Sequence, residues 1–454
     1  MEGIMKQSKL GRRLLLFPTP FQGHQYPMLH LATLLHSKGF SITIIQTPYN
    51  PINPTYFPHL TFRSFYNSSL ESYSKIPPSD PSTILSVMDD CSEPFQDCLS
   101  QILQETGAAT DKEPIAALIT DPVWKFAGSV AASFNLPRMV LRTGSMSSLL
   151  VFSSLPCLRE KGYFPPQDHK LNEPLPELPP LKARDLPLEW LHNERLEALV
   201  QETKISQGVI GNTFEELEDY SIARVHQILS IPIFPIGPLH KHSPTYDTNY
   251  WAQDQTSIGW LNKQAPKSVL YVSFGSVAAM SKTEFLELAW GLLDSMVPFL
   301  WVVRPGLIQG SEANNDSLPE GYLEMVGERG HVVKWAPQLE VLSHPSVGGF
   351  WTHNGWNSTL ESICEGVPML CQPILSDQNM NARHVSDGWR IGLKLEKGLK
   401  REEIARSIRK LMLEEGEEMR NRITALQQKA TLCVKEGGSS YISLERLTSY
   451  LLSF

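Results

Sequence analysis

The sequence is poor in cysteine, and it contains no long hydrophobic run. Its 454 residues include six cysteines, and no two of them form a CxxC pair. Such sparse usage is typical of reduced thiols and argues against a disulfide framework. No stretch approaches the roughly 18 consecutive apolar residues that a transmembrane helix needs. We therefore expect no membrane span and a cytoplasmic protein.

The sequence also has no long run of basic residues. Lys and Arg together number 40, against 48 Asp and Glu, which gives a net charge of −8. Proteins that follow a phosphate backbone carry basic patches, so nucleic acid is not an expected partner. Basic residues precede the apolar run 14–17, as in a signal peptide, but the run is too short and no small-residue cleavage site follows. We expect a polar tail that leads into a buried strand.

Several catalytic motifs are missing. The sequence has no GxSxG elbow, no P-loop, no HExxH, and no Asp-x-Asp pair of the kind that holds Mg²⁺ or Mn²⁺ under a nucleotide-sugar. The nearest acidic pair, Asp111 and Glu113, is expected in a polar loop, and Asp89 and Asp90 are expected on a solvated helix face. These absences predict chemistry without a metal or another cofactor.

Short apolar runs alternate with helical patterns along the chain, which is the signature of parallel sheets built from βαβ units. The length suggests about two to three domains, and an apolar content of 41% is sufficient for packed cores. The expected strands are 13–17, 40–46, 115–120 and 138–141 in a first series, and 268–273, 299–303, 331–333, 348–352 and 367–370 in a second. Expected helices include 27–39, 123–134 and 441–452.

The polar, turn-rich stretch 240–256 separates the two series and is the linker candidate. We therefore predict an α/β protein with two doubly wound domains, over 1–239 and 257–436. The last segment, 437–454, has no strand after its helix and is expected to cross back onto the first domain. The Pro-rich region 164–187 is expected to be ordered but irregular.

The most informative window runs from Trp335 to Gln378, because its groups suit successive parts of a UDP-sugar. Trp335 suits the uracil face, His353 and the amides near Ser358 suit the diphosphate, Glu361 suits the ribose hydroxyls, and Asp377 and Gln378 suit the sugar hydroxyls. This combination indicates a glycosyltransferase.

Two strand-end loops in the second series are candidates for binding the diphosphate. One runs from the strand ending at Thr352 through Gly355 into a helix, whose exposed amides and positive end favour an anion. The other is the loop 273–276, in which Ser276 offers a hydroxyl. Ordinary tight turns are the alternative interpretation of each loop.

His24 is the candidate general base, because it follows the first strand, and doubly wound sheets bind ligands beyond the carboxyl ends of their strands. Gly23 would permit a tight turn there, and an imidazole titrates near neutrality. Asp121 ends another strand and would hold the imidazole in one tautomer. The alternatives are a capping or surface histidine and, for Asp121, an N-cap of the next helix. The two roles of Asp121 can coexist.

The segments WAPQ, HNGWNS, EGVP and DQ of this window resemble the signature of plant secondary-product glycosyltransferases of family 1. The resemblance extends from FPTPFQGH to KEGGSSY. It is strongest to the subgroup that contains cytokinin N-glucosyltransferases and steviol-glycoside glucosyltransferases. It implies a GT-B fold with two Rossmann-like domains facing across a cleft, an acceptor-binding N-terminal domain, a UDP-sugar donor, an inverting mechanism and no metal.

The resemblance also assigns roles to individual residues. It makes His24 the catalytic base and Asp121 its partner. On the donor side, Trp335, Ala336 and Gln338 contact the uridine base, Glu361 binds the ribose, Ser276, His353, Gly355, Asn357 and Ser358 surround the diphosphate, and Thr143, Trp356, Asp377 and Gln378 hold the sugar. Gln378 is associated with a preference for glucose. Asn354 is a departure, because many members have Cys at this position.

The acceptor is much less defined. The resemblance suggests Phe21, Trp124, Met146 and Leu150 as lining residues, and the segments 68–81 and 164–187 as variable walls. Flavonoids, terpenoids, phenolic acids and cytokinins stay open as acceptors, as do O- and N-glucosylation. We expect a monomer that makes a β-glucoside. The alternatives are a non-catalytic UDP-sugar sensor and a sugar-nucleotide epimerase on the same fold.

Overall fold

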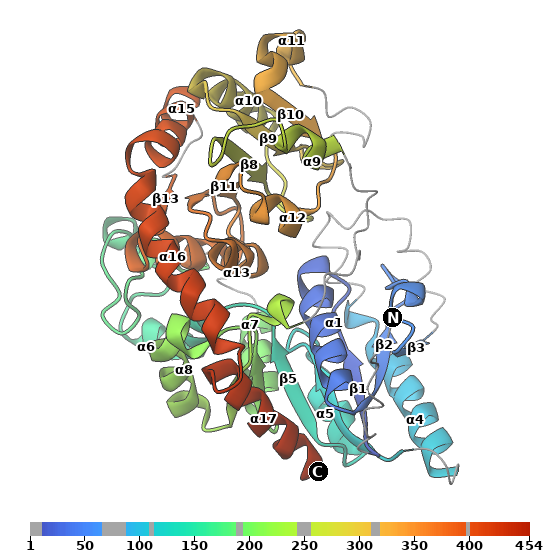
Figure 1. The fold of residues 1–454 in the computed structure, drawn as a ribbon. Coiled ribbons are helices and arrows are strands. Elements are labelled where there is room, and N and C mark those ends of the chain that lie inside the picture. The colour runs from blue at the N-terminus through green and yellow to red at the C-terminus, as the bar shows by residue number, and fades with distance from the viewer. Residues whose placement is uncertain are drawn as a thin grey trace. The chain divides into compact units, whose positions relative to one another are not determined.

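The computed structural model describes residues 11–65, 88–108, 113–187, 194–242, 256–309, 318–395 and 400–454. The chain forms two units (Figure 1). Unit 1 comprises Met1–Ser154, His192–Thr248 and Leu432–Phe454, and unit 2 comprises Leu155–Leu191 and Asn249–Thr431. The division thus differs from the contiguous domains expected from the sequence, because Leu155–Leu191 belong to unit 2. Most of the expected linker and the segment 68–81 lie outside the described residues.

Unit 1 is built on a parallel sheet, which has seven strands within the described residues, in the order β3-β2-β1-β4-β5-β6-β7. The strands are β1 (Arg13–Phe17), β2 (Ser41–Gln46), β3 (Thr61–Ser64), β4 (Ile115–Thr120), β5 (Arg138–Arg142), β6 (Val209–Gly211) and β7 (Ile233–Pro235). β1 pairs with β2 on one side and with β4 on the other. The strand order reverses between β1 and β4, and this switch point is where doubly wound sheets bind ligands.

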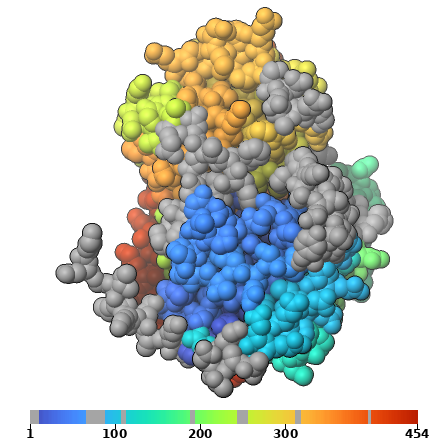
Figure 2. All heavy atoms as spheres, turned by 90° about the vertical axis from the view of Figure 1, so that its right-hand side faces the viewer, coloured from blue at the N-terminus to red at the C-terminus, as the bar shows by residue number. Residues whose placement is uncertain are grey.

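Helices cover both faces of this sheet. They are α1 (Gln22–Ser37), α4 (Ser92–Ala108), α5 (Ala127–Ser133), α6 (Met146–Glu160), α7 (Glu194–Lys204), α8 (Glu215–Leu229) and α17 (Ser439–Leu452), with the short helix η5 (Leu239–Lys241). Leu444, Leu447 and Leu451 of α17 share a buried core with Leu31 and Leu35 of α1. On the surface, blue residues from the N-terminal part of the chain adjoin the cyan residues around α4 (Figure 2).

Helix α1 begins at Gln22, earlier than the expected start at position 27, and therefore contains Pro27. Proline inside a helix removes one backbone hydrogen bond but does not have to end the helix. The expected tight turn at Gly23 is wrong, because Gly23 lies in the first helical turn. Consequently, His24 is held by a helix and not by a loop.

Unit 2 is built on a second parallel sheet, with six described strands in the order β10-β9-β8-β11-β12-β13. These are β8 (Val269–Ser273), β9 (Phe299–Val302), β10 (Gly330–Val333), β11 (Val347–Thr352), β12 (Met369–Cys371) and β13 (Gly392–Lys394). β8 and β11 are neighbours at the centre, with Val272 opposite Trp351. The loops after these two strands are therefore brought together.

The helices of unit 2 are α9 (Thr256–Leu261), α10 (Lys282–Ser295), α11 (Tyr322–Val326), α12 (Gln338–Ser343), α13 (Trp356–Glu365), α14 (Gln378–Arg383), α15 (Arg401–Arg409) and α16 (Gly416–Cys433), of which unit 2 includes α16 up to Thr431. The core contains Phe285, Trp301, Tyr322 and Trp351. No helix in the described parts of the chain has the length and apolar character needed to cross a membrane.

The Pro-rich region 164–187 is ordered and irregular, as expected. It contains the single turns η2 (Asp168–Lys170) and η3 (Ala183–Asp185). Its leucines Leu175, Leu178, Leu181 and Leu186 are all buried. The region therefore has an apolar interior and a fixed backbone, although it forms no long helix or strand.

Candidate active site

His24 and Asp121 are adjacent in unit 1, as the sequence predicted. His24 lies in the first turn of α1, directly after β1, and Asp121 directly follows β4. The His24 Nδ1 atom lies 2.5 Å from Asp121 Oδ2. Asp121 is 1% exposed, whereas the His24 side chain is 31% exposed. The pair therefore combines a buried carboxylate with an imidazole that is accessible to a ligand.

The contact defines the tautomer of the neutral imidazole. A carboxylate can only accept a hydrogen bond, so Nδ1 carries the proton and Nε2 carries the lone pair. Thr19 Oγ1 donates to the same Asp121 oxygen at 3.3 Å. The other oxygen accepts from the backbone N–H of Val123 at 3.0 Å. Asp121 thus has both expected kinds of contact: one oxygen orients the imidazole, and the other accepts a backbone hydrogen bond from the segment that follows.

Thr143 lies beside this pair. Its Oγ1 atom is 3.1 Å from His24 Nδ1, and Thr143 is buried at the end of β5. The resemblance had placed Thr143 with the donor sugar, whereas the described contact is with the imidazole in unit 1. Thr143 therefore acts at least as a second support for the His24 ring.

The four suggested acceptor residues differ in exposure. The Phe21 ring is partly exposed, and its centroid lies 5.7 Å from that of His24. Trp124 is fully buried and stacks on Phe17 with a centroid distance of 4.4 Å. Met146 and Leu150, on α6, are also buried. Phe21 is the best placed of the four to touch a ligand, and the position of Trp124 favours a packing role.

In unit 2, two strand-end loops meet at His353. A Cβ atom on Gly275, after β8, would lie 2.7 Å from His353 Cε1, and one on Gly355 would lie 2.6 Å from His353 Nε2. Only glycine fits this closely at both positions. Gly275 also has a φ of +71°, which side chains rarely adopt. The two glycines bring the backbone of both loops against one imidazole.

Burial, assisted by the charge of Arg304, lowers the pKa of His353 to about 4. The ring is therefore neutral at physiological pH and can offer a hydrogen bond but no positive charge. Its Nδ1 atom is buried and has no hydrogen-bond partner among the described residues. Such an unsatisfied polar atom in a strand-end loop is a group that a bound ligand can satisfy.

Gly355 is the N-cap of α13, so this helix begins at the loop that the sequence predicted to hold a diphosphate. The preceding residue, Asn354, has a φ of +62°, which Asn tolerates better than most residues. Its side chain donates to Cys371 Sγ at 3.2 Å. Asn354 therefore points into the core, and the start of α13 is the part of this loop whose amides and positive helix end favour an anion.

One turn into α13, a polar cluster surrounds Gln338. The Gln338 amide nitrogen donates to Glu361 Oε2 at 2.6 Å and to Ser358 Oγ at 2.9 Å. Tyr271 donates to the Gln338 oxygen at 3.4 Å. Burial raises the pKa of Glu361 to about 7, although the hydrogen bond from Gln338 opposes the shift. Glu361 is thus a partly buried acceptor whose charge changes within the physiological range.

Gln378 begins α14, and its side chain has two ends with different partners. The carbonyl oxygen accepts from the backbone N–H groups of Ile374 and Leu375 at 2.8 and 3.0 Å. This contact fixes the loop before the helix and leaves the amide nitrogen as the group that can bind a ligand. Asp377 is the N-cap of the same helix and lies 3.5 Å from the side-chain nitrogen of Asn381.

The remaining predicted donor residues all lie in unit 2. Trp335 and Ala336 are buried before α12, and Trp356 is buried at the start of α13. Ser276 and Asn357 are partly exposed in the loop after β8 and in the first turn of α13. These placements keep the predicted donor residues within one unit, with the exception of Thr143.

The sequence analysis did not identify three residues that support the donor side. Tyr271 contacts Gln338, and Asn381 donates to the Asn354 carbonyl at 3.0 Å. Arg304 is buried, and its Nε atom donates to the Gly275 carbonyl at 2.8 Å. None of them is close in sequence to the group it supports, so no local pattern could have revealed them.

Comparison with known proteins identifies the family. Residues 55–426 match the family described as UDP-glucoronosyl and UDP-glucosyl transferase. The chain belongs to this family. UDP-glycosyltransferase 76B1 of Arabidopsis thaliana is 45% identical, with 97% of this chain and 98% of that protein covered. UDP-glycosyltransferase 76G1 of Stevia rebaudiana is also 45% identical, with 97% of each covered.

A solved structure agrees with this assignment. Phytolacca americana UGT2, complexed with UDP-2fluoro-glucose and pterostilbene, has a TM-score of 0.79 and is 28% identical, with 97% of this chain and 99% of that chain covered. The two parallel-sheet units are therefore those of a GT-B glycosyltransferase, which confirms the expected fold class. The protein is an enzyme that transfers a glycosyl group from a UDP-sugar.

Proposed function

We propose that this glycosyltransferase transfers glucose from UDP-glucose to a hydroxyl group of a small hydrophobic plant metabolite, with inversion at the sugar C1 and without a metal. The observation that carries the proposal is the His24 imidazole, held by Asp121 with Nε2 left to accept a proton. The glycosyltransferases at 45% identity support the plant assignment. The pterostilbene bound to Phytolacca americana UGT2, a phenol, supports a hydroxyl acceptor of this size.

The proposed chemical step uses His24 as a general base. Nε2 takes the proton of the acceptor hydroxyl while its oxygen attacks C1 of the glucose from the face opposite UDP. The bond from C1 to the diphosphate oxygen breaks, and the α-linked donor becomes a β-glucoside. Asp121 stabilises the imidazolium that forms, because it is a buried carboxylate in contact with Nδ1.

The leaving UDP carries the negative charge that develops in this step. In the proposal, the first amides of α13, the Ser276 hydroxyl and the neutral His353 ring stabilise that charge by hydrogen bonds. Glu361 binds the ribose hydroxyls, and Asp377 and Gln378 bind the glucose. In this proposal, the amides of α13, the Ser276 hydroxyl and the His353 ring take the place of a metal at the departing diphosphate.

A product analysis with UDP-glucose tests this proposal. The purified enzyme is incubated with a panel of phenols, flavonoids, terpenoid alcohols, carboxylic acids and cytokinins, with and without EDTA, and products are detected by mass spectrometry. We expect a β-glucoside of at least one hydroxyl acceptor, assigned by NMR of the anomeric proton, with the same yield in EDTA.

Three results would each contradict a separate part of the proposal. An α-glucoside would rule out inversion. Activity that is lost in EDTA and restored by Mg²⁺ would rule out the metal-free mechanism. Transfer to amines or carboxylates alone would rule out a hydroxyl acceptor.

A further inference from the structure

Within unit 2, the segment that connects α6 to α7 contacts the rest of the unit through a buried carboxylate, Asp185. This residue ends η3 and has no exposed surface. Its two neighbours in the ion cluster, Arg383 and Lys394, have side chains that are 3% and 7% exposed. A buried charge is tolerated only when it is paired and hydrogen-bonded. The cluster is therefore a specific junction and not a surface ion pair.

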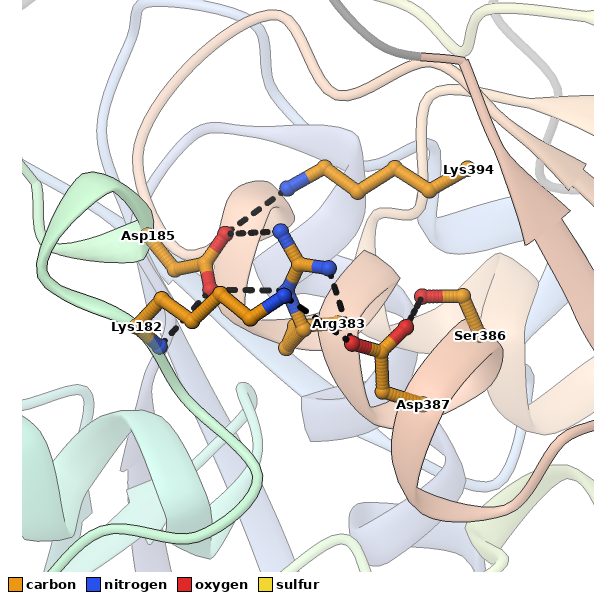
Figure 3. Close-up of polar contacts among 6 residues, drawn as sticks. All are labelled: Lys182, Asp185, Arg383, Ser386, Asp387 and Lys394. Atoms are coloured by element: carbon orange, nitrogen blue, oxygen red, sulfur yellow. Dashed lines mark hydrogen bonds and ion pairs between the residues drawn. The ribbon is translucent and has the colours of Figure 1, made fainter. Parts of the chain in front are cut away.

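Figure 3 shows how Asp185 satisfies both of its oxygens. Arg383 donates from Nε to Oδ2 at 2.8 Å and from Nη2 to Oδ1 at 3.2 Å. Lys394 Nζ donates to Oδ1 at 2.8 Å, and the Lys182 backbone N–H donates to Oδ2 at 3.0 Å. Burial alone would raise the pKa of Asp185, but Arg383 and Lys394 lower it below its usual range. Asp185 is thus ionised wherever the protein is folded near neutral pH.

Arg383 is the last residue of α14, whose first residue is Gln378. The Arg383 side chain also donates from Nη1 to Asp387 at 2.9 Å, so two carboxylates hold the C-terminal end of this helix. A helix of this length spans only about 8 Å. Any shift of Arg383 is therefore passed to Gln378 and to the Asp377 cap almost undiminished.

Two more contacts hold α14 and the turn that follows it. Asn381, in the middle of the helix, donates to the Asn354 carbonyl in the loop before α13. Pro180, in the connecting segment, packs beside Gly388, because a Cβ atom there would lie 3.2 Å from the proline ring. Gly388 ends the π-helical turn η7 (His384–Gly388), which directly follows α14. The diphosphate loop thus contacts α14 itself, and the connecting segment contacts Arg383 at its end and the turn that follows it.

We propose that Asp185 is a positioning residue for the donor sugar: by anchoring Arg383, it sets the position of Asp377 and Gln378 at the other end of α14. This inference rests on the proposed function, in which those two residues bind glucose. It assigns the Pro-rich connecting segment a role on the donor side, in addition to any contact with the acceptor.

The variant Asp185→Asn tests this role with little change in volume. Asparagine keeps one acceptor oxygen, but it removes the charge between Arg383 and Lys394. The matched control is Lys394→Met, which removes another ion pair of the same carboxylate but leaves the contact with α14 intact. Isothermal titration calorimetry of each full-length variant gives the dissociation constants for UDP and for UDP-glucose.

We expect Asp185→Asn to weaken the binding of UDP-glucose by about tenfold, while the affinity for UDP stays within about twofold of the wild type. The difference arises because a displacement well below 1 Å at the sugar is already costly. Lys394→Met should leave the ratio of the two constants as in the wild type. A merely structural role would lower the melting temperature and the active fraction without changing this ratio. An unchanged ratio in folded Asp185→Asn, or an equal change in Lys394→Met, would overturn the inference.

Two further variants keep the result interpretable. Arg383→Lys retains the cation but cannot form the two-point contact with Asp185, so it should shift the ratio of the two dissociation constants in the same direction. It replaces Asp185→Asn if that variant does not fold. Gln378→Ala tests the proposed function directly. If Gln378→Ala changes the ratio and Asp185→Asn does not, only the positioning role fails. If Gln378→Ala does not change it, the sugar assignment fails.

Discussion

The ionisation of Glu361 leads to a quantitative prediction about UDP binding. In the ligand-free enzyme, burial raises the pKa of this carboxyl to about 7. The two ribose hydroxyls of UDP can each donate to Glu361, and only the ionised carboxylate offers both of its oxygens as acceptors, because protonation turns one of them into a donor. Binding should therefore be strong above pH 7 and should weaken as Glu361 becomes protonated.

The magnitude follows from the titration. With a pKa of about 7, the ionised fraction of Glu361 falls about tenfold between pH 8 and pH 6, which corresponds to about 1.4 kcal/mol of binding free energy. A terminal phosphate also titrates, with a second pKa of about 6, so UDP itself contributes to the pH dependence. The variant Glu361→Gln removes the first effect and keeps the second.

The assay is calorimetric titration of UDP into wild-type enzyme and Glu361→Gln at pH 6 and pH 8. The increase in dissociation constant from pH 8 to pH 6 should be about tenfold larger for the wild type than for the variant. An equal pH dependence of the two proteins would refute the assigned role of Glu361. Tighter binding to the wild type at pH 6 than at pH 8 would contradict it as well.

Three other substitutions have defined outcomes. Gln378→Ala should weaken the binding of UDP-glucose more than the binding of UDP, as measured by calorimetry. Equal losses of affinity for the two ligands would exclude Gln378 from the sugar site. Gly275→Ala should weaken the binding of UDP by at least an order of magnitude, because the added Cβ would displace His353. The control is Gly321→Ala, which has a similar φ of +72° but whose Cβ would lie no closer than 3.6 Å to any neighbour, and this variant should bind UDP normally. Trp124→Ala should lower the free energy of unfolding by about 3–5 kcal/mol, because Trp124 is fully buried against Phe17. A denaturant titration measures this change, and a loss below about 1 kcal/mol would exclude the packing role.

The sequence predicted the central strands well, because each is a run of buried apolar residues long enough to recognise. The expected ranges of β1 and β4 match the structure residue for residue. The strands β3, β6, β7 and β13 were not predicted, and each of them has only three or four residues. Their extended conformation depends on pairing with a neighbouring strand, as between Val209 and Ile233, which no local pattern encodes.

The candidate site shows the same limit. His24 and Asp121 were predictable because both follow strands that meet at the switch point of the sheet. The predicted start of α1 at Pro27 is too late, because the helix extends back to Gln22 and tolerates a proline in its second turn. The contact between Asp185 and Arg383 joins residues 198 positions apart, and the assignment of Leu155–Leu191 to unit 2 depends on such contacts. Only tertiary structure shows them.

The most direct test of the proposed mechanism is the turnover of His24→Ala with UDP-glucose and an ordinary hydroxyl acceptor, measured together with its affinity for UDP. His36→Ala, on the same helix, is the control and should retain activity, because the His36 ring contacts the Phe40 carbonyl and the His59 ring. The mechanism predicts that His24→Ala loses at least about 10²-fold in turnover, as expected for a general base, and binds UDP as the wild type does. Turnover of His24→Ala close to that of the wild type would contradict it.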